Sequence, residues 1–324
     1  YEIGTGDWSS DVCLPISYAG PDPVSVRYRN FTNQKVDLRL QEEASGDPEM
    51  GHVTEEIGYL ILGDVQPRDI LTSGLEIGEI ETGHGWKKVT FENPHRHPVI
   101  IPGLLSFNGA DPAIPRISEV KTTDFKMQVA EWDYLDQTHT RETIPYLVIE
   151  DGVYNVGGDA WEAGRAFVDG SKWNKIQFRS GQFGANPIVM VGQTTLREPE
   201  KVTIRLRNIT ANGFEARLYR QESDKTIQHV AETIHFLAVD RGAGNIGGVT
   251  DYKTWNRDDA NNQWKEIALP IFSDYPYVYG SAQTSRGMDP FGVRAKDHTV
   301  SSFHLKLQEE TSAAPDRHHI PEIV

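Results

Sequence analysis

One arginine and one large apolar residue recur together along the chain at intervals of 89 residues, and this spacing constrains the fold more than any other feature. The arginine stands at Arg27, Arg116, Arg205 and Arg294. The apolar residue stands at Val36, Phe125, Phe214 and Phe303. A His-x-x-Glu motif follows each pair, at His52/Glu55, His139/Glu142, His229/Glu232 and His319/Glu322. These three series of recurring residues, which we call ladders, indicate tandem copies of one structural unit.

The ladders divide the chain into four units, which we place at residues 1–66, 67–153, 154–243 and 244–324. Each unit contains an acidic residue followed by proline, a pattern typical of a bend between strands. The first unit is shortened at its front, and the fourth stops before its closing strand. Two hypotheses fit these ends: the chain is a window from a longer array, or a neighbouring chain donates the missing strand.

The pattern inside each unit predicts β-strands. Val36, Leu38 and Leu40 alternate with polar residues, which indicates a strand with one buried and one wet face. The continuous apolar run 146–149 predicts a central strand. No long amphipathic helix is indicated. We therefore predict an all-β protein built from tandem antiparallel β-sandwiches.

Charge and composition narrow the function classes. Acidic residues outnumber basic residues 47 to 32, for a formal charge of −15, so nucleic acid is a poor partner. No apolar stretch is long enough to predict a membrane span. Cys13 is the sole cysteine, which excludes an intrachain disulfide and a cysteine-based zinc site. No catalytic triad order, paired-carboxylate motif or phosphate loop is present, and we predict that the chain is not an enzyme.

The order of segments resembles the H-type lectin domain of snail agglutinins and of the discoidin C-terminal domain. The segments that carry the resemblance are HPVIIPGLLSF, the arginine strand VTIRLRN and the phenylalanine strand GFEARLYRQ. Phrases such as SFNGADP and LQEE are similar to tandem copies of this domain in large bacterial extracellular proteins. The resemblance covers nearly the whole chain. It implies six-stranded antiparallel sandwiches and, in animal members, trimers that bind N-acetylgalactosamine or galactose.

The resemblance also implies a sugar site made from an arginine, a Trp-His pair, and an Asp and a Gly in a loop. The arginine matches in all four copies, at Arg27, Arg116, Arg205 and Arg294. The tryptophan matches in the second copy, at Trp132, where Asp133 replaces the histidine. The Asp- and Gly-bearing loop is shortened. The second copy is therefore the best candidate site, with Arg116, Trp132, Asp133 and His139 as its carbohydrate-binding residues.

Each candidate also has a structural interpretation. The arginines are predicted to lie on the polar face of their strand, where they could bind sugar or form ion pairs that join strands. His-x-x-Glu resembles half a metal site, or a hydrogen-bonded junction between loop and strand. We expect no cofactor, although Asp258, Asp259, Asn261 and Asn262 offer oxygen ligands for calcium. The sequons at Asn30 and Asn208 fall at equivalent turns.

These features favour a secreted or cell-surface protein that binds glycans or polysaccharide without catalysis, and gains avidity from several weak sites. The main alternative is a structural subunit of a fibre, matrix or appendage that self-associates head to tail. A third interpretation is the binding region of a larger polysaccharide-degrading enzyme.

Overall fold

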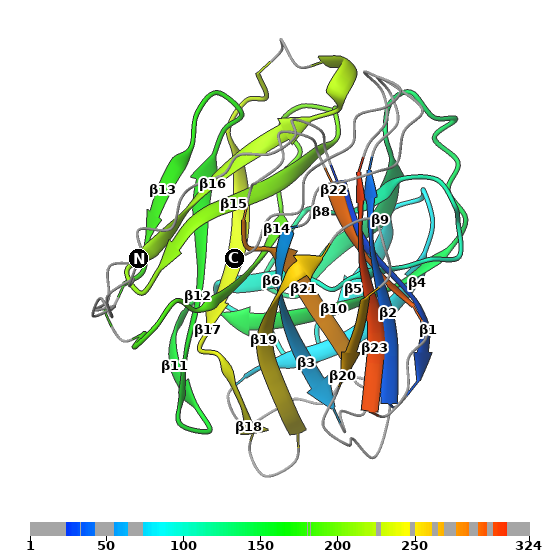
Figure 1. Cartoon of the computed structure of the whole chain (residues 1–324). Helices are drawn as coiled ribbons and strands as arrows, with labels where there is room; N and C mark the ends of the chain where they lie inside the picture. Colours follow the sequence, from blue (N-terminus) through cyan, green and yellow to red (C-terminus); the bar gives the residue numbers. More distant parts are fainter. Residues whose placement is uncertain are drawn as a thin grey trace, which may run out of the picture.

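The protein is seen in a computed structural model, which describes residues 24–32, 34–42, 55–63, 74–179, 181, 183–224, 228–246, 250–260, 265–268, 277–284, 291–296 and 301–309. Apart from one 3-10 turn at Glu222–Asp224, the regular elements of these residues are strands (Figure 1). The all-β prediction is confirmed. The strands form three two-sheet bodies, which we call the second, third and split sandwiches.

The second sandwich comes from the second predicted copy. One of its sheets has the order β4-β10-β6 and the other the order β5-β9-β8, all antiparallel. The strands are β4 (Glu76–Thr82), β5 (Lys87–Thr90), β6 (Pro98–Pro102), β8 (Ala113–Ser118), β9 (Asp124–Glu131) and β10 (Glu142–Glu150). Between the sheets lies a core that includes Phe125 of the repeat, with Ile117 and Val148. The repeated phenylalanine is thus a core residue of its own sandwich.

The third sandwich repeats this plan. Its sheets have the orders β11-β12-β17-β14 and β13-β16-β15. The strands are β11 (Gly152–Val156), β12 (Asp159–Val168), β13 (Asn174–Gln177), β14 (Ile188–Gln193), β15 (Val202–Thr210), β16 (Gly213–Arg220) and β17 (Glu232–Val239). Phe214 packs at 5.3 Å, ring centroid to ring centroid, against Phe236 of the opposite sheet. In each sandwich the closing strand, β10 or β17, lies between two neighbours.

The split sandwich draws its closing strand from the other end of the chain. The strand β3 (Glu55–Gly63) lies between β19 (Thr250–Ala260) and β21 (Tyr277–Ala282), antiparallel to both, and β18 (Gly242–Ile246) completes the sheet. Figure 1 shows blue β3 beside the olive and gold strands. The closing strand that the fourth copy lacks is therefore supplied by β3, from the first copy of the same chain. The first and fourth predicted copies share this body instead of forming separate sandwiches.

The other sheet joins the same two copies and adds the short strand β7 of the second copy. It has the order β20-β23-β2-β22-β1-β7. The strands are β1 (Val24–Thr32), β2 (Gln34–Glu42), β7 (Leu105–Ser106), β20 (Lys265–Ala268), β22 (Phe291–Lys296) and β23 (Ser301–Glu309). Parallel pairing sets Arg27 opposite Arg294 and Val36 opposite Phe303, the residues that the repeat makes equivalent. The register of this sheet thus follows the period of the sequence.

The inner sheets of the second and third sandwiches bury both of their faces. On β10, Tyr146 and Val148 point into the second sandwich, whereas Leu147 and Ile149 enter a core shared by all three bodies. Leu60 of β3, Leu237 of β17 and residues of β19 and β21 reach the same shared core. Burial on both faces explains why the closing strands β10 and β17 have continuous apolar runs.

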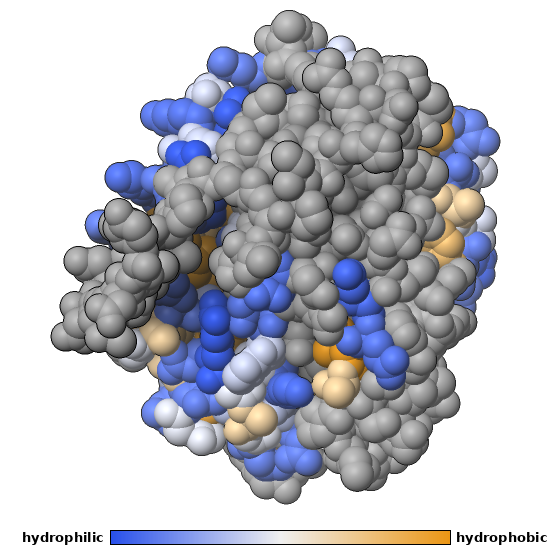
Figure 2. All heavy atoms as spheres, in the orientation of Figure 1, coloured by the Kyte–Doolittle hydropathy of each residue, from blue (hydrophilic) through white to orange (hydrophobic). Residues whose placement is uncertain are grey.

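Polar residues dominate the described surface on the face shown in Figure 2, in keeping with the net charge of −15. Among the described residues, we find no helix with the length and apolar character needed to cross a membrane.

Candidate functional site

The joints between sandwiches are built by side chains that satisfy exposed strand edges. The N–H of Ile100, on the edge strand β6, donates to Nδ1 of His235 of the third sandwich at 2.9 Å. The N–H of Val189, 89 residues later on β14, donates at 2.7 Å to Oε1 of Gln283, whose Nε2 donates back to the Val189 carbonyl. An unpaired edge invites pairing with other chains, so these side chains both cap the edges and fix the joints.

His235 makes the joint between the second and third sandwiches sensitive to pH. Burial, with the Arg165 guanidinium as a further cause, lowers the pKa of His235 to about 3. The unfolded chain, with a pKa near 6.5, then binds more protons than the folded chain between pH ~6.5 and ~3. The stability that depends on neutral His235 is complete above pH ~6.5. It should fall by up to about 1.4 kcal/mol per pH unit as the pH drops towards 3.

The measurement is urea denaturation of the wild type and His235→Asn across pH 3–8. An asparagine oxygen can accept the Ile100 hydrogen bond but does not titrate in this range. We expect the stability difference between the two proteins to shift in favour of the variant as the pH falls. Parallel pH profiles would contradict the assignment.

Arg116 of the predicted sugar site lies inside the same joint. It is 3% exposed on β8, and its Nη1 donates to the carbonyl of Pro199 in the third sandwich at 3.0 Å. Burial lowers the pKa of Arg116 to about 10, against the opposing effect of nearby Glu232, Asp133 and Glu200. The prediction that Arg116 lies on a polar, solvent-exposed face of its strand is therefore wrong, because the third sandwich covers that face.

Trp132 and Asp133, two further residues of the predicted sugar site, also contact other residues of the protein. The Trp132 ring is fully buried and packs with Ile114 and Ala130, so it has no free face for a sugar ring. Asp133 is exposed, but its carboxylate pairs with Nζ of Lys201 at 2.5 Å. Its N–H donates to Gln221 of the third sandwich at 3.1 Å. Trp132, predicted as a carbohydrate-binding residue, is therefore a core residue in this structure.

His139 belongs to a buried polar network rather than to an open site. Its Nδ1 lies 2.9 Å from Oε1 of Glu131, and its Nε2 lies 3.0 Å from Oε1 of Glu142. Burial, together with Asp111 and Asp136, raises the pKa of Glu131 to about 7. The Glu142 carboxylate accepts three further hydrogen bonds from residues 106–109, which fixes that loop on β10. The His-x-x-Glu motif of this copy is a hydrogen-bonded junction.

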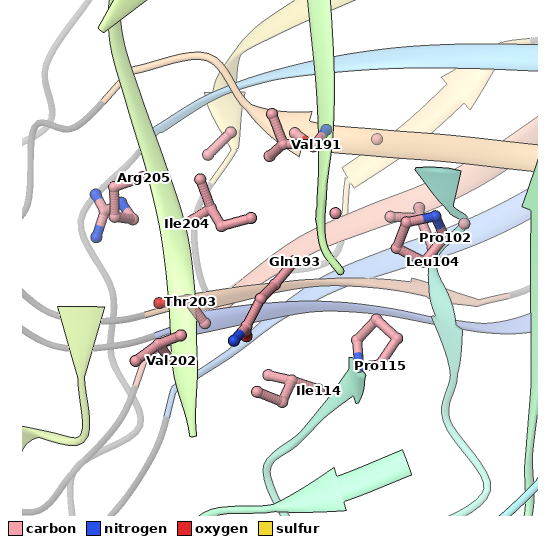
Figure 3. A pocket seen from close by; sticks show the side chains of 15 residues that line it. Pro102, Leu104, Ile114, Pro115, Val191, Gln193, Val202, Thr203, Ile204 and Arg205 are labelled. Atoms are coloured by element: carbon pink, nitrogen blue, oxygen red, sulfur yellow. The ribbon is translucent and has the colours of Figure 1, made fainter. Parts of the chain in front are cut away.

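Arg205 lines a pocket where the three sandwiches converge (Figure 3). The pocket is bounded by Pro102–Leu104, Val191–Gln193 and Gly280–Ala282, segments spaced 89 residues apart that come from the second, third and split sandwiches. In Figure 3 the Arg205 guanidinium points away from Pro102 and Leu104, and apolar side chains form much of the wall. Arg205 is 1% exposed and lies 5.9 Å from the Tyr219 ring centroid.

The structure describes few of the side chains of the other predicted site residues. Arg27 and Arg294 lie on β1 and β22 as paired residues, and their side chains fall outside the described residues. Of the predicted calcium ligands, Asp258 is an exposed residue of β19. The side chains of Asp259, Asn261 and Asn262 fall outside the described residues. Arg116 and Asp133 therefore meet at one joint.

Two possible binding sites were not predicted from the sequence. The first is a groove between the second and third sandwiches, lined by half-exposed Trp86 and by Arg96, Lys121, Arg165 and Arg197. The second is a group formed by Glu198, Glu200 and His229 in the third sandwich. Repeat spacing could have singled out the second group, since Glu198 and His229 both belong to repeated motifs.

Comparison with known proteins gives one relative at low identity. The chain is 22% identical over 325 residues to Halomucin of Haloquadratum walsbyi. The match covers 96% of this chain and 3% of Halomucin, so the chain spans a small fraction of that relative's length. No family model matches the chain, and no solved structure matches it.

Proposed function

We propose that this chain is a non-catalytic structural module of an extracellular or cell-surface protein, in which three lectin-like sandwiches form one rigid body. The observation that carries the proposal is the hydrogen bond from buried Arg116 to the Pro199 carbonyl. A position that would recognise sugar in an H-type lectin here joins two sandwiches. The similarity to Halomucin supports an extracellular location by its name, since mucins are extracellular proteins.

The shared core gives this role a mechanical test. Because Leu60, Leu147 and Leu237 from three sandwiches pack in one cluster, the bodies should not unfold independently. Stretching single molecules from their ends should therefore give one dominant unfolding event. Three separate events of equal size, as for beads on a string, would contradict a rigid structural module.

A second candidate, glycan binding, is favoured by the groove rather than by the predicted lectin site. Trp86 is 39% exposed there and offers an aromatic face of the kind that stacks on pyranose rings. Arginine forks can bind carboxylate or sulfate groups in pairs of hydrogen bonds. The four basic side chains of the groove, in a chain of net charge −15, therefore suit an acidic polysaccharide.

A glycan array on the wild type and Trp86→Ala separates the two candidates. Because Trp86 is partly exposed, its removal should leave the fold intact. Binding of acidic glycans that is lost in Trp86→Ala would support recognition in the groove. We expect instead no specific signal from either protein, as the structural role requires. Binding that survives in Trp86→Ala would contradict both assignments.

A further inference from the structure

Three potential metal ligands meet at one end of the third sandwich. Glu198 and Glu200 belong to the segment before β15, and His229 belongs to the segment before β17. One ligand atom from each lies within 4.8 Å of the other two. Nε2 of His229 is 3.7 Å from Oε2 of Glu198, which is too long for a hydrogen bond.

The state of His229 suits a metal ligand. The residue is 2% exposed, and its Nδ1 lies 2.8 Å from the Val230 carbonyl, to which it can only donate. A neutral ring in this tautomer directs the Nε2 lone pair towards the two carboxylates. That Nε2 has no hydrogen-bond partner among the described residues, and neither has the buried Oε2 of Glu200. Buried polar atoms without partners are rare in folded proteins, and a cation bound between these two acceptors would satisfy both.

The second sandwich shows how the same position looks without such a site. There His139 uses both ring nitrogens, one on Glu131 and one on Glu142. Arg220 stands 89 residues after Glu131, so His229 has no carboxylate on that side. Ala113 stands at the second-copy position near that of Glu200, 87 residues before it. The third sandwich has thus lost the partner that occupies the histidine and gained a carboxylate in front of it.

We propose that Glu198, Glu200 and His229 bind a divalent transition-metal ion, with Zn²⁺ as the best fit. One imidazole and two carboxylates suit zinc, whereas calcium takes oxygen ligands alone. The hydrogen bond from Nδ1 to a backbone carbonyl is the usual outer-shell support of a metal-binding histidine. Ligand atoms of a tetrahedral zinc site lie about 3.4 Å apart, so the 3.7 Å contact needs a shift of a few tenths of an ångström.

The surrounding charges are compatible with this ion. Nη2 of Arg220 lies 3.1 Å from Oε1 of Glu200, which leaves Oε2 without a hydrogen-bond partner among the described residues and so available as a ligand. Pro199, between the two glutamates, accepts the hydrogen bond of Arg116. A metal ion would therefore fix the loop that the second sandwich holds. Metal binding at this group is independent of the proposed structural function.

The test is calorimetric titration of chelator-treated full chain with ZnCl₂. We expect one strong site per chain. Zinc-edge X-ray absorption should show nitrogen and oxygen neighbours at about 2.0–2.1 Å, without the sulfur distance of about 2.3 Å that Cys13 would give.

His229→Gln and Glu198→Gln should each weaken zinc binding by at least about 100-fold, because outer-shell changes alone cost about 10- to 100-fold. His84→Gln, at an exposed histidine, is the matched control and should bind like the wild type. If buried His229→Gln fails to fold by circular dichroism, the less buried Glu198→Gln decides the question. Absence of the strong site in the wild type, or its survival in Glu198→Gln, would overturn the proposal.

Discussion

Replacing Leu60 by aspartate should prevent the split sandwich from closing. Leu60 lies on β3 with no exposed surface, in the core that the three inner sheets share. A carboxylate there would have to enter the folded state protonated or leave the core, and either course costs several kcal/mol. The milder Leu60→Ala should lower the free energy of unfolding by about 2–5 kcal/mol through lost contacts and a cavity. Urea denaturation followed by tryptophan fluorescence measures both effects.

The matched control is Leu196→Ala, a leucine that is partly exposed beside the groove. It should change the free energy of unfolding by no more than about 0.5 kcal/mol. Wild-type stability of Leu60→Asp would show that β3 does not lie between β19 and β21. The experiment therefore tests the pairing of distant segments and not merely the presence of a core.

The strands and their repetition could be predicted from sequence because both are local signals. Alternation around Val36 and the apolar run at 146–149 report which faces of a strand are buried, and the 89-residue ladders report that the plan recurs. Partner choice is a different problem. The closing strands β3, β10 and β17 have similar patterns, so each could serve any of the three sandwiches. Since the cost of closing a longer loop rises slowly with its length, sequence separation does not decide between them.

The candidate site was only partly predictable for a related reason. Alternation correctly indicates that Arg116 points away from the core of its own sandwich, but it cannot show that another sandwich covers that side. Trp132 is buried as well, against Ile114 and Ala130 of its own sandwich. The group of Glu198, Glu200 and His229 depends on two differences between copies: Arg220 stands at the position of Glu131, and Glu200 stands near the position of Ala113. A comparison of the copies reveals these differences, but not the contacts that result from them.

Loss of Arg116 should have the second large effect. Arg116→Ala removes the buried positive charge near Glu200, Glu232 and Asp133, together with the hydrogen bond to Pro199. A hydrogen bond from a charged group contributes about 1.5–3 kcal/mol, and the Pro199 carbonyl would lose its donor. We expect a loss of this size in the free energy of unfolding. Arg116→Lys should recover part of it, since lysine keeps the charge but lacks the planar fork.

The appropriate control is Arg141→Ala, at an exposed arginine paired with exposed Glu81 over 3.7 Å. Surface pairs of this kind contribute about 0–1 kcal/mol, so its stability should stay near that of the wild type. A sugar-binding arginine would give the opposite result at position 116, because its removal would abolish binding and leave the fold almost unchanged. The size of the stability loss in Arg116→Ala therefore distinguishes an arginine that joins two sandwiches from an arginine that binds a ligand. If Arg116→Ala is as stable as the wild type, the repeated arginines would instead be assigned to ligand recognition.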